Sequence, residues 1–110
     1  MNIPDYSTLD MEAMAKEIGL KVKHIPMLVG SFLGESSEIL IRLESAIATK
    51  DYDAINHNAH SIKGSAGNLR FNEIYEMAKA MEMAAKESDS SFAYEETFDF
   101  IKKGIATICI

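Results

Sequence analysis

The residues most informative about the fold are 51–69, which read DYDAINHNAHSIKGSAGNL. Apolar side chains recur here every three or four residues, the spacing that gathers side chains on one side of an α-helix. The members of this stripe are Tyr52, Ile55, Ala59, Ile62, Ala66 and Leu69. The pattern predicts one amphipathic helix that starts at Asp51 and buries one of its faces.

Two further helices are predicted upstream of this stretch. A short one runs from Leu9 to Ile18, with Thr8 as its N-cap and Gly19 just past its end. A longer one carries Pro26 in its first turn, a position that proline tolerates, and ends near Thr49. Its apolar stripe comprises Leu28, Val29, Phe32, Leu33, Ile39, Leu40, Leu43 and Ile47.

Two more helices are predicted downstream, after a brief break at residues 70–72. The first has an apolar side made of Ile74, Met77, Ala78, Met81, Ala84 and Ala85. The polar residues 87–91 predict a loop, and Ser90 or Ser91 is expected to cap the last helix. The stripe of that helix comprises Tyr94, Phe98, Ile101, Ile105 and Ile108. We therefore expect an all-α fold, an antiparallel up-down four-helix bundle with a short additional N-terminal helix across one end.

Composition limits the classes of protein to which the chain can belong. Its 110 residues predict a single domain over residues 1–110, and Met1 with a complete first helix favours a free-standing protein over an excised module. A net charge of -6 argues against nucleic acid or anionic lipid as a partner. No apolar run is long enough to span a membrane, and no signal peptide is apparent. The single cysteine, Cys109, fits a reducing compartment, so we expect a cytoplasmic protein.

The polar face of the helix at residues 51–69 carries an unusual group of side chains. At 100° per residue, Lys63, Gly64 and Gly67 all fall within about 60° of His60. The apolar stripe lies on the opposite side, so His60 is expected to point outward rather than into the core. An exposed lysine one turn from the histidine can neutralise an anion held on the imidazole.

The two glycines of this face weaken the helix in which they lie. Each costs about 1 kcal/mol relative to alanine, a noticeable part of a domain stability of about 5–15 kcal/mol. Because both are expected to face outward, their absent side chains favour the close approach of an external partner beside His60. For Gly67, a helix-end position that merely tolerates glycine is an equal alternative.

The stretch AHSIKGSAGNL at residues 59–69 resembles the signature of histidine-containing phosphotransfer (HPt) domains of bacterial and fungal phosphorelays. In that family the core motif is His-x-x-Lys-Gly-Ser, followed by small residues and a leucine. The resemblance extends from about Pro26 to the C-terminus, through a long helix, the motif helix, a break and two more helices.

The resemblance implies a function and a role for each site residue. His60 would be the phosphoacceptor, exchanging a phosphoryl group with the aspartate of a response-regulator receiver domain, either free or in a hybrid sensor histidine kinase. Lys63 would stabilise the phosphoryl charge, and Gly64 and Gly67 would leave room for the docking partner. Family members often carry Gln or Glu twenty-two residues after the histidine, here Glu82, to orient the imidazole. A solvated residue at the helix boundary is the open alternative for Glu82.

The expected protein is a monomeric phosphoryl carrier rather than a stand-alone enzyme, without a metal or cofactor of its own. ATP-dependent kinase activity is not expected, because Asn58 stands where a phosphate-binding loop ending in Lys63-Gly64-Ser65 would need glycine. His57 is the rival acceptor, but it lacks lysine and glycine one turn later. A metal site at His57 and His60 would lack a third ligand. The alternative function is a non-catalytic helical module that inhibits or scaffolds a receiver or sensor kinase.

Overall fold

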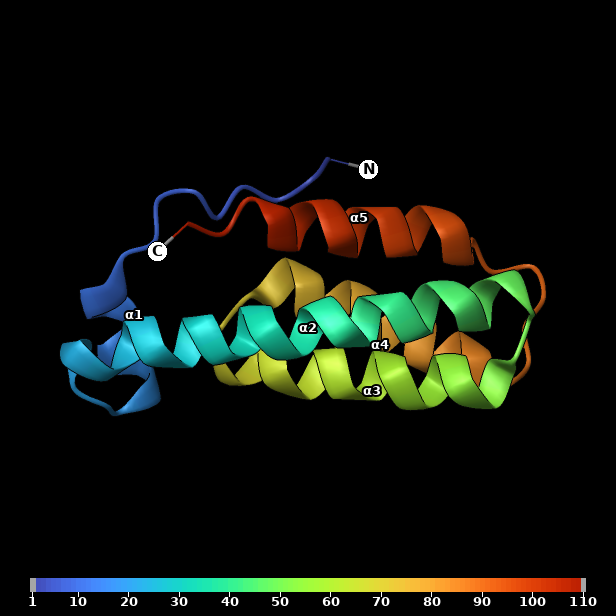
Figure 1. Cartoon of the computed structure of the whole chain (residues 1–110), viewed down its shortest axis with the longest axis horizontal. Helices are drawn as coiled ribbons and strands as arrows, with labels where there is room; N and C mark the ends of the chain where they lie inside the picture. The colour runs from blue at the N-terminus through green and yellow to red at the C-terminus, as the bar shows by residue number, and fades with distance from the viewer. Residues whose placement is uncertain (1, 110) are drawn as a thin grey trace.

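The structure is a computed structural model that describes residues 2–109. These residues form α-helices and one short 3₁₀ helix, with no strand among them. The elements are α1 (Met11–Ile18), η1 (Val22–His24), α2 (Ile25–Ala48), α3 (Tyr52–Asn68), α4 (Asn72–Lys86) and α5 (Tyr94–Ala106). Helices α2 to α5 run alternately up and down, and α1 lies at one end of the bundle (Figure 1). The predicted all-α fold is confirmed, although η1 was not predicted.

The core lies along the axis of the four long helices. Each long helix packs on the next along the chain, and α5 returns to α2, so the bundle closes on itself. The large side chains that are almost completely buried include Leu43, Ile55, Ile62, Ile74, Met81 and Ile101. Within the described residues, no helix combines the length and the hydropathy needed to cross a membrane.

The buried side of α2 is narrower than predicted. Leu28, Leu33, Leu40 and Ile47 are only partly buried. The fully buried seam alternates strictly by four and three residues and consists of Ile25, Val29, Phe32, Ser36, Ile39, Leu43 and Ala46. Such a seam is the part of a helix that faces its neighbours in a bundle, and the other apolar side chains flank it. The seam runs through Ser36, whose hydroxyl donates to the Leu33 carbonyl at 3.2 Å.

Two predicted helix caps are wrong. Helix α1 begins at Met11, and its N-cap is Asp10 rather than Thr8, since the Asp10 carboxylate accepts from the Ala13 amide at 3.0 Å. Neither Ser90 nor Ser91 caps α5, which begins after Ala93 with no side-chain cap. The Ser91 hydroxyl instead donates to the carboxylate of Asp89 at 2.6 Å, within the loop. A serine side chain near the start of a helix can form a hydrogen bond within the preceding turn as readily as it can cap the helix.

The four long helices are connected by turns of one recurring form. Lys50, Arg70 and Ser88 follow α2, α3 and α4, and each has a positive φ, of 55°, 66° and 51°. After each of these residues, the next backbone amide donates to a carbonyl five residues earlier, as in a Schellman motif. None of the three positions is glycine, so these left-handed helix ends could not be predicted from residue type. Gly19, with φ 82°, plays the same part after α1, as predicted.

The segment before α1 packs along α5 (Figure 1). The Tyr6 amide donates to the Thr107 hydroxyl at 2.8 Å. Gly104 allows this approach, because a Cβ atom there would lie only 2.9 Å from Cγ of Pro4. The sequence pattern did not predict this contact, since Pro4 and Gly104 are remote in the chain.

The Asp51 cap of α3 has a measurable effect on stability. Its carboxylate accepts from the Ala54 amide at 3.2 Å. We expect Asp51→Ala to lower the free energy of unfolding by about 1 kcal/mol in urea denaturation, because a donor of the first turn loses its partner. Asp51→Asn is the control and should change stability little, since asparagine caps equally well. Equal losses in both variants would contradict the assigned cap.

Candidate functional site

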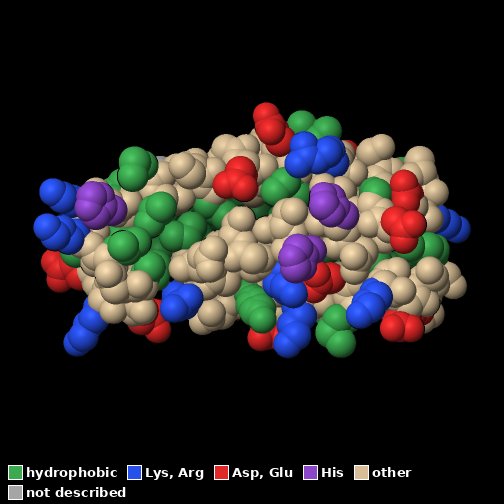
Figure 2. All heavy atoms as spheres, turned by 90° about the horizontal axis from the view of Figure 1, so that it is seen from below, with side chains coloured by type: hydrophobic (Ala, Val, Ile, Leu, Met, Phe, Trp, Pro, Cys, Tyr) green, Lys and Arg blue, Asp and Glu red, His purple; other side chains and the backbone are tan. Residues whose placement is uncertain are grey.

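The candidate site lies on the outer face of α3, where it runs beside α4. His60 projects from this face with 65% of its side chain exposed. The apolar residues of α3 are turned the other way, into the core. Figure 2 looks onto the surface that carries the histidine side chains, and near its middle a pair of them lies beside lysine and acidic side chains. This arrangement agrees with the expectation that His60 faces outward.

Glu82 of α4 connects His60 and Lys63. One oxygen of its carboxylate, Oε2, is hydrogen-bonded to Nδ1 of His60. The other oxygen, Oε1, accepts from Nζ of Lys63 at 2.7 Å. The backbone carbonyl of Glu82 accepts from Nδ2 of Asn56 at 2.9 Å, which ties α4 to α3 at the same level. The side chain of Glu82 is 15% exposed, so it is not the solvated boundary residue that was the alternative.

The electrostatics of this group favour a charged Glu82. Its partial burial alone would raise the pKa of the carboxyl group, but the hydrogen bonds from Lys63 and His60 outweigh burial and hold this pKa below its ordinary value. The same hydrogen bond to Glu82 raises the pKa of Lys63. At neutral pH the bridge therefore contains a carboxylate and an ammonium group.

The charge of Glu82 determines the tautomer of His60. A carboxylate has no proton to donate and can only accept, so Nδ1 of the imidazole carries the hydrogen. The lone pair of the neutral ring is then on Nε2. Because most of the side chain is exposed, Nε2 is the nitrogen available to an incoming group.

The two glycines of α3 differ in their surroundings. A Cβ atom added at Gly64 would meet nothing within 4 Å, so the surface beside His60 is open there. A Cβ atom at Gly67 would lie 3.7 Å from the ring of Tyr75 on α4. Gly67 is therefore half-buried and lies beside an aromatic side chain of the neighbouring helix, so it is less open than the outward-facing position that was expected. Tyr75 was not predicted, since the sequence does not show which side of α4 faces α3.

The chain that carries this motif, helical bundle and exposed histidine matches a known protein family. The family model of the Hpt domain matches residues 27–108. The chain belongs to the Hpt domain family. This confirms the resemblance carried by residues 59–69, and it assigns the chain to the histidine phosphotransfer domains of phosphorelays.

A solved structure has the same fold as this Hpt domain. It is the crystal structure of histidine-containing phosphotransfer protein B (HptB) from Pseudomonas aeruginosa PAO1, with a TM-score of 0.78 and 24% sequence identity. The match covers 91% of this chain and 86% of that one. Comparison with curated protein sequences gives no significant match. At this identity the structural likeness establishes the shared bundle and nothing finer.

The rival histidines of this Hpt domain lack the surroundings of His60. His57 is exposed one turn earlier on α3, and no carboxylate of residues 2–109 forms an ion pair with it. His24 lies at the start of α2, away from the Glu82 bridge. Among the described residues, no group of three His, Cys, Asp or Glu side chains is placed to hold a metal ion. The structure therefore brings together His60, Lys63 and Glu82, and neither His57 nor His24 forms an ion pair with a carboxylate among the described residues.

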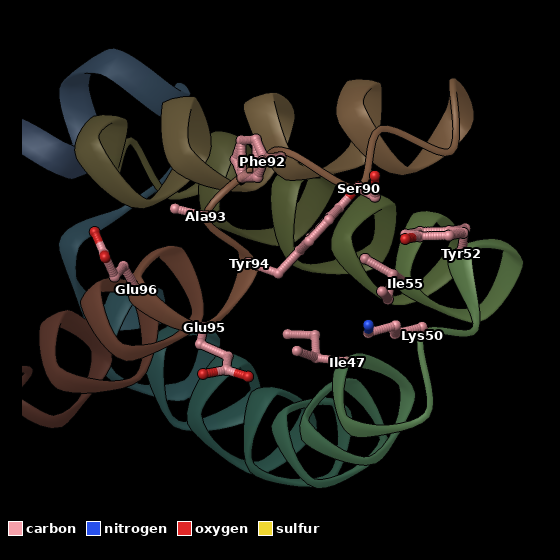
Figure 3. Close-up of a pocket in the computed structure, with 10 residues that line it drawn as sticks. All are labelled: Ile47, Lys50, Tyr52, Ile55, Ser90, Phe92, Ala93, Tyr94, Glu95 and Glu96. Atoms are coloured by element: carbon pink, nitrogen blue, oxygen red, sulfur yellow. The ribbon is translucent and has the colours of Figure 1, made fainter.

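A separate hollow of about 280 Å³ lies at one end of the bundle. It is formed between the turn after α2 and the start of α5, and Tyr52, Tyr94 and Lys50 are among its lining residues (Figure 3). Tyr52 and Tyr94 pack with ring centroids 5.9 Å apart. None of the residues of the Glu82 bridge lines this hollow, so it forms no part of the candidate site.

Proposed function

We propose that this Hpt domain carries a phosphoryl group on Nε2 of His60, which it exchanges with the aspartate of a response-regulator receiver domain. The observation that supports the proposal is the exposed His60 ring, bonded through Nδ1 to the carboxylate of Glu82. This contact leaves Nε2 as a neutral nucleophile that faces the solvent. A receiver domain of a hybrid sensor histidine kinase presents the same aspartate chemistry.

The transfer is a substitution at phosphorus. The lone pair of Nε2 attacks the phosphoryl group of the aspartyl phosphate, and the bond between phosphorus and the aspartate oxygen breaks. The electron pair of that bond leaves with the aspartate as a carboxylate. Nδ1 keeps its proton, so the ring gains a positive charge, which the carboxylate of Glu82 stabilises at hydrogen-bonding distance. The reverse sequence returns the group to an aspartate.

The surface around His60 suits a docked protein better than a small molecule. Gly64 leaves open space one turn from the histidine, and a receiver must bring its aspartate within bonding distance of Nε2. Several large apolar side chains near the start of α2 are exposed, including Met27 at 65% and Val22 at 43%. Apolar side chains also extend over the face that bears the histidines (Figure 2). Signalling contacts of this kind can be small.

The direct experiment is transfer from a phosphorylated receiver. Purified protein is incubated with a receiver that carries labelled aspartyl phosphate, and the label is followed to this chain. A phosphohistidine is stable to alkali and labile to acid, so both treatments identify the bond. The proposal predicts stoichiometric, acid-labile, alkali-stable label. Failure to accept label from each receiver of the source organism would contradict it.

A side chain added at Gly64 is expected to impair docking without lowering the stability of the bundle. Gly64→Gln should leave the bundle slightly more stable, because glycine is the weaker helix former by about 0.5 kcal/mol. The same variant should lower the second-order rate of phosphoryl transfer at least about tenfold, equivalent to about 1.4 kcal/mol, since it fills the space that the receiver approaches. Rapid-quench transfer assays and urea denaturation measure the two effects.

Ala80 provides the matched control for this variant. It is exposed on α4, about 160° around the helix from Glu82, and therefore faces away from His60. Ala80→Gln adds the same side chain and should leave transfer unchanged. If Gly64→Gln also transfers at the normal rate, the receiver does not approach this part of α3.

A further inference from the structure

An apolar groove runs between α2 and α5, which lie side by side in the bundle (Figure 1). Two adjoining hollows of about 340 and 190 Å³ form this groove, and Glu44, Phe98 and Lys102 line both of them. Within the described part of the chain, no residue of α3 or α4 lines either hollow, so His60 lies outside the groove. Phosphoryl transfer at His60 therefore leaves this surface without a role.

Ile41 of α2 projects into the solvent beside this groove. It is 71% exposed, more than any other large apolar residue among residues 2–109. Together with the half-buried Leu40 it lines the smaller hollow, whose floor includes the ring of Phe98. Ile41 lies outside the buried seam of α2, so the core of its own chain does not use it. A protruding apolar side chain next to an apolar hollow forms a contiguous patch, and such patches mark interaction surfaces.

The groove carries charges of both signs. Glu44 of α2 and Lys102 of α5 line both hollows, and neither forms an ion pair with another of the described residues. Asp99, which lines the larger hollow, is already paired with Lys103 at 2.9 Å, and Glu95 lines the larger hollow alone. A partner with charges of one sign would be repelled by either Glu44 or Lys102. A surface that carries both signs would match both of them.

A second copy of this chain has the surface that such a groove requires. In a two-fold dimer the same patch faces itself, so each patch must contain both halves of every contact. This patch contains an apolar side chain, Ile41, with a hollow beside it, and a carboxylate, Glu44, with an ammonium group, Lys102. The smaller hollow of about 190 Å³ has room for the four carbons of an isoleucine side chain, since a cavity of about 150 Å³ holds benzene. The N-terminal segment of the same chain does not fill the hollow, because Pro4 packs at Gly104 instead.

We propose that two copies of this chain associate through the groove between α2 and α5 about a two-fold axis. Ile41 of each copy enters the smaller hollow of the other, and Glu44 of each copy pairs with Lys102 of the other. The interface is small, so association is weak and depends on protein concentration. The monomer expected from the sequence is then the form at low concentration. His60 of both copies stays outside the interface, since no residue of α3 lines the groove within the described chain.

Sedimentation equilibrium of the full chain tests the association. Between about 10 μM and about 1 mM protein, the average mass should rise from that of one chain toward that of two. Ile41→Glu should remain monomeric throughout, because a carboxylate does not enter an apolar hollow without a partner. Met83→Glu is the matched control, since Met83 of α4 is 58% exposed and the variant adds the same charge. It should associate as the wild type does, and circular dichroism verifies that both variants are folded.

Three results of this experiment would overturn the proposal. They are a wild-type protein that stays monomeric over the whole range, an Ile41→Glu variant that associates as the wild type does, and equal losses in Ile41→Glu and Met83→Glu. The last result would show that added negative charge, rather than this groove, controls association. The measurement needs no phosphoryl group, so none of these outcomes bears on transfer at His60.

An exchange of charges tests the two-fold arrangement. Glu44→Lys and Lys102→Glu should each weaken association about tenfold, because each variant leaves like charges facing one another across the axis. The protein with both substitutions keeps the net charge of -6 and should associate within about twofold of the wild type, since the opposite charges meet again. Association of the double variant that is no stronger than that of the single variants would overturn the proposal. In a mixed sample of labelled and unlabelled chains, a nuclear Overhauser effect between the Ile41 methyl groups of one copy and the Phe98 ring of the other should appear at dimer concentrations. Its absence there would also overturn the proposal.

Discussion

Replacement of His60 by glutamine should abolish acceptance of a phosphoryl group from a receiver, with no label above background. Glutamine preserves much of the size and polarity of histidine, but its amide nitrogen has no lone pair available to attack phosphorus. The fold should persist, because 65% of the His60 side chain is exposed and, among residues 2–109, its polar contact is with Glu82 alone. The assay is transfer of labelled phosphate, with circular dichroism to verify the helices.

His57→Gln is the control for the His60 variant. His57 lies one turn away on the same helix and is also exposed, but no carboxylate of the described part of the chain forms an ion pair with its ring. This variant should accept phosphate at the wild-type rate. Stoichiometric label on the His60→Gln protein would contradict the assigned acceptor. Receiver output that continues normally in His60→Ala, with binding intact, would favour the non-catalytic binding module instead.

Replacement of Phe71 by alanine should lower the free energy of unfolding by about 3–5 kcal/mol, because it leaves a large cavity in a close-packed core. Phe71 is 1% exposed and lies at the turn between α3 and α4. Its ring centroid is 4.8 Å from that of Tyr6 and 5.3 Å from that of Phe32, so it joins the N-terminal segment and α2 to this turn. Urea denaturation followed by circular dichroism measures the loss.

Phe92 provides a matched comparison for Phe71. It lies in the loop before α5 and is only partly buried. Phe92→Ala removes the same number of atoms but should destabilise the protein by less than half as much, because less of the ring leaves water on folding. Equal losses in the two variants would contradict the central position of Phe71. If the transfer rate per folded molecule stays normal in Phe71→Ala, the substitution affects stability and not the transfer reaction.

The helices were predicted well where one regular spacing continued over several turns. The stripes of α3 and α4 contain most of the buried residues of these helices, because helix geometry fixes which side chains share a face. Tyr52, Met77 and Ala84 are only partly buried, and the buried Asn58 was not part of the predicted stripe. On α3 this was enough to place His60 on the outer face, opposite Ile62 and Ala66, before any contact with another helix was known. The helix ends were less predictable, since Thr8, Ser90 and Ser91 can form turns as well as caps.

Contacts between segments that are remote in the sequence could not be predicted from the spacing of apolar residues. Lys63 and Glu82 are 19 residues apart, and their meeting depends on how far α4 is rotated about its own axis against α3. The same rotation brings Tyr75 next to Gly67. The position of Gly67 around α3, taken by itself, predicts only that this residue lies on the face of His60. The packing of Pro4 on Gly104 likewise follows from the path of the segment before α1, for which no periodic pattern exists. The family resemblance predicted that Glu82 contacts His60, whereas its hydrogen bond to Lys63 was not predicted.

The proposed phosphoryl transfer depends on the identity of one nucleophilic atom, Nε2 of His60. Protein labelled with nitrogen-15 and phosphorylated by a receiver allows this atom to be identified directly, because a phosphorus–nitrogen bond produces coupling between the two nuclei. We expect coupling on the Nε2 resonance of His60, with the hydrogen retained on Nδ1 beside Glu82. Coupling on Nδ1, on His57 or on His24, or phosphate on a residue other than histidine, would contradict it.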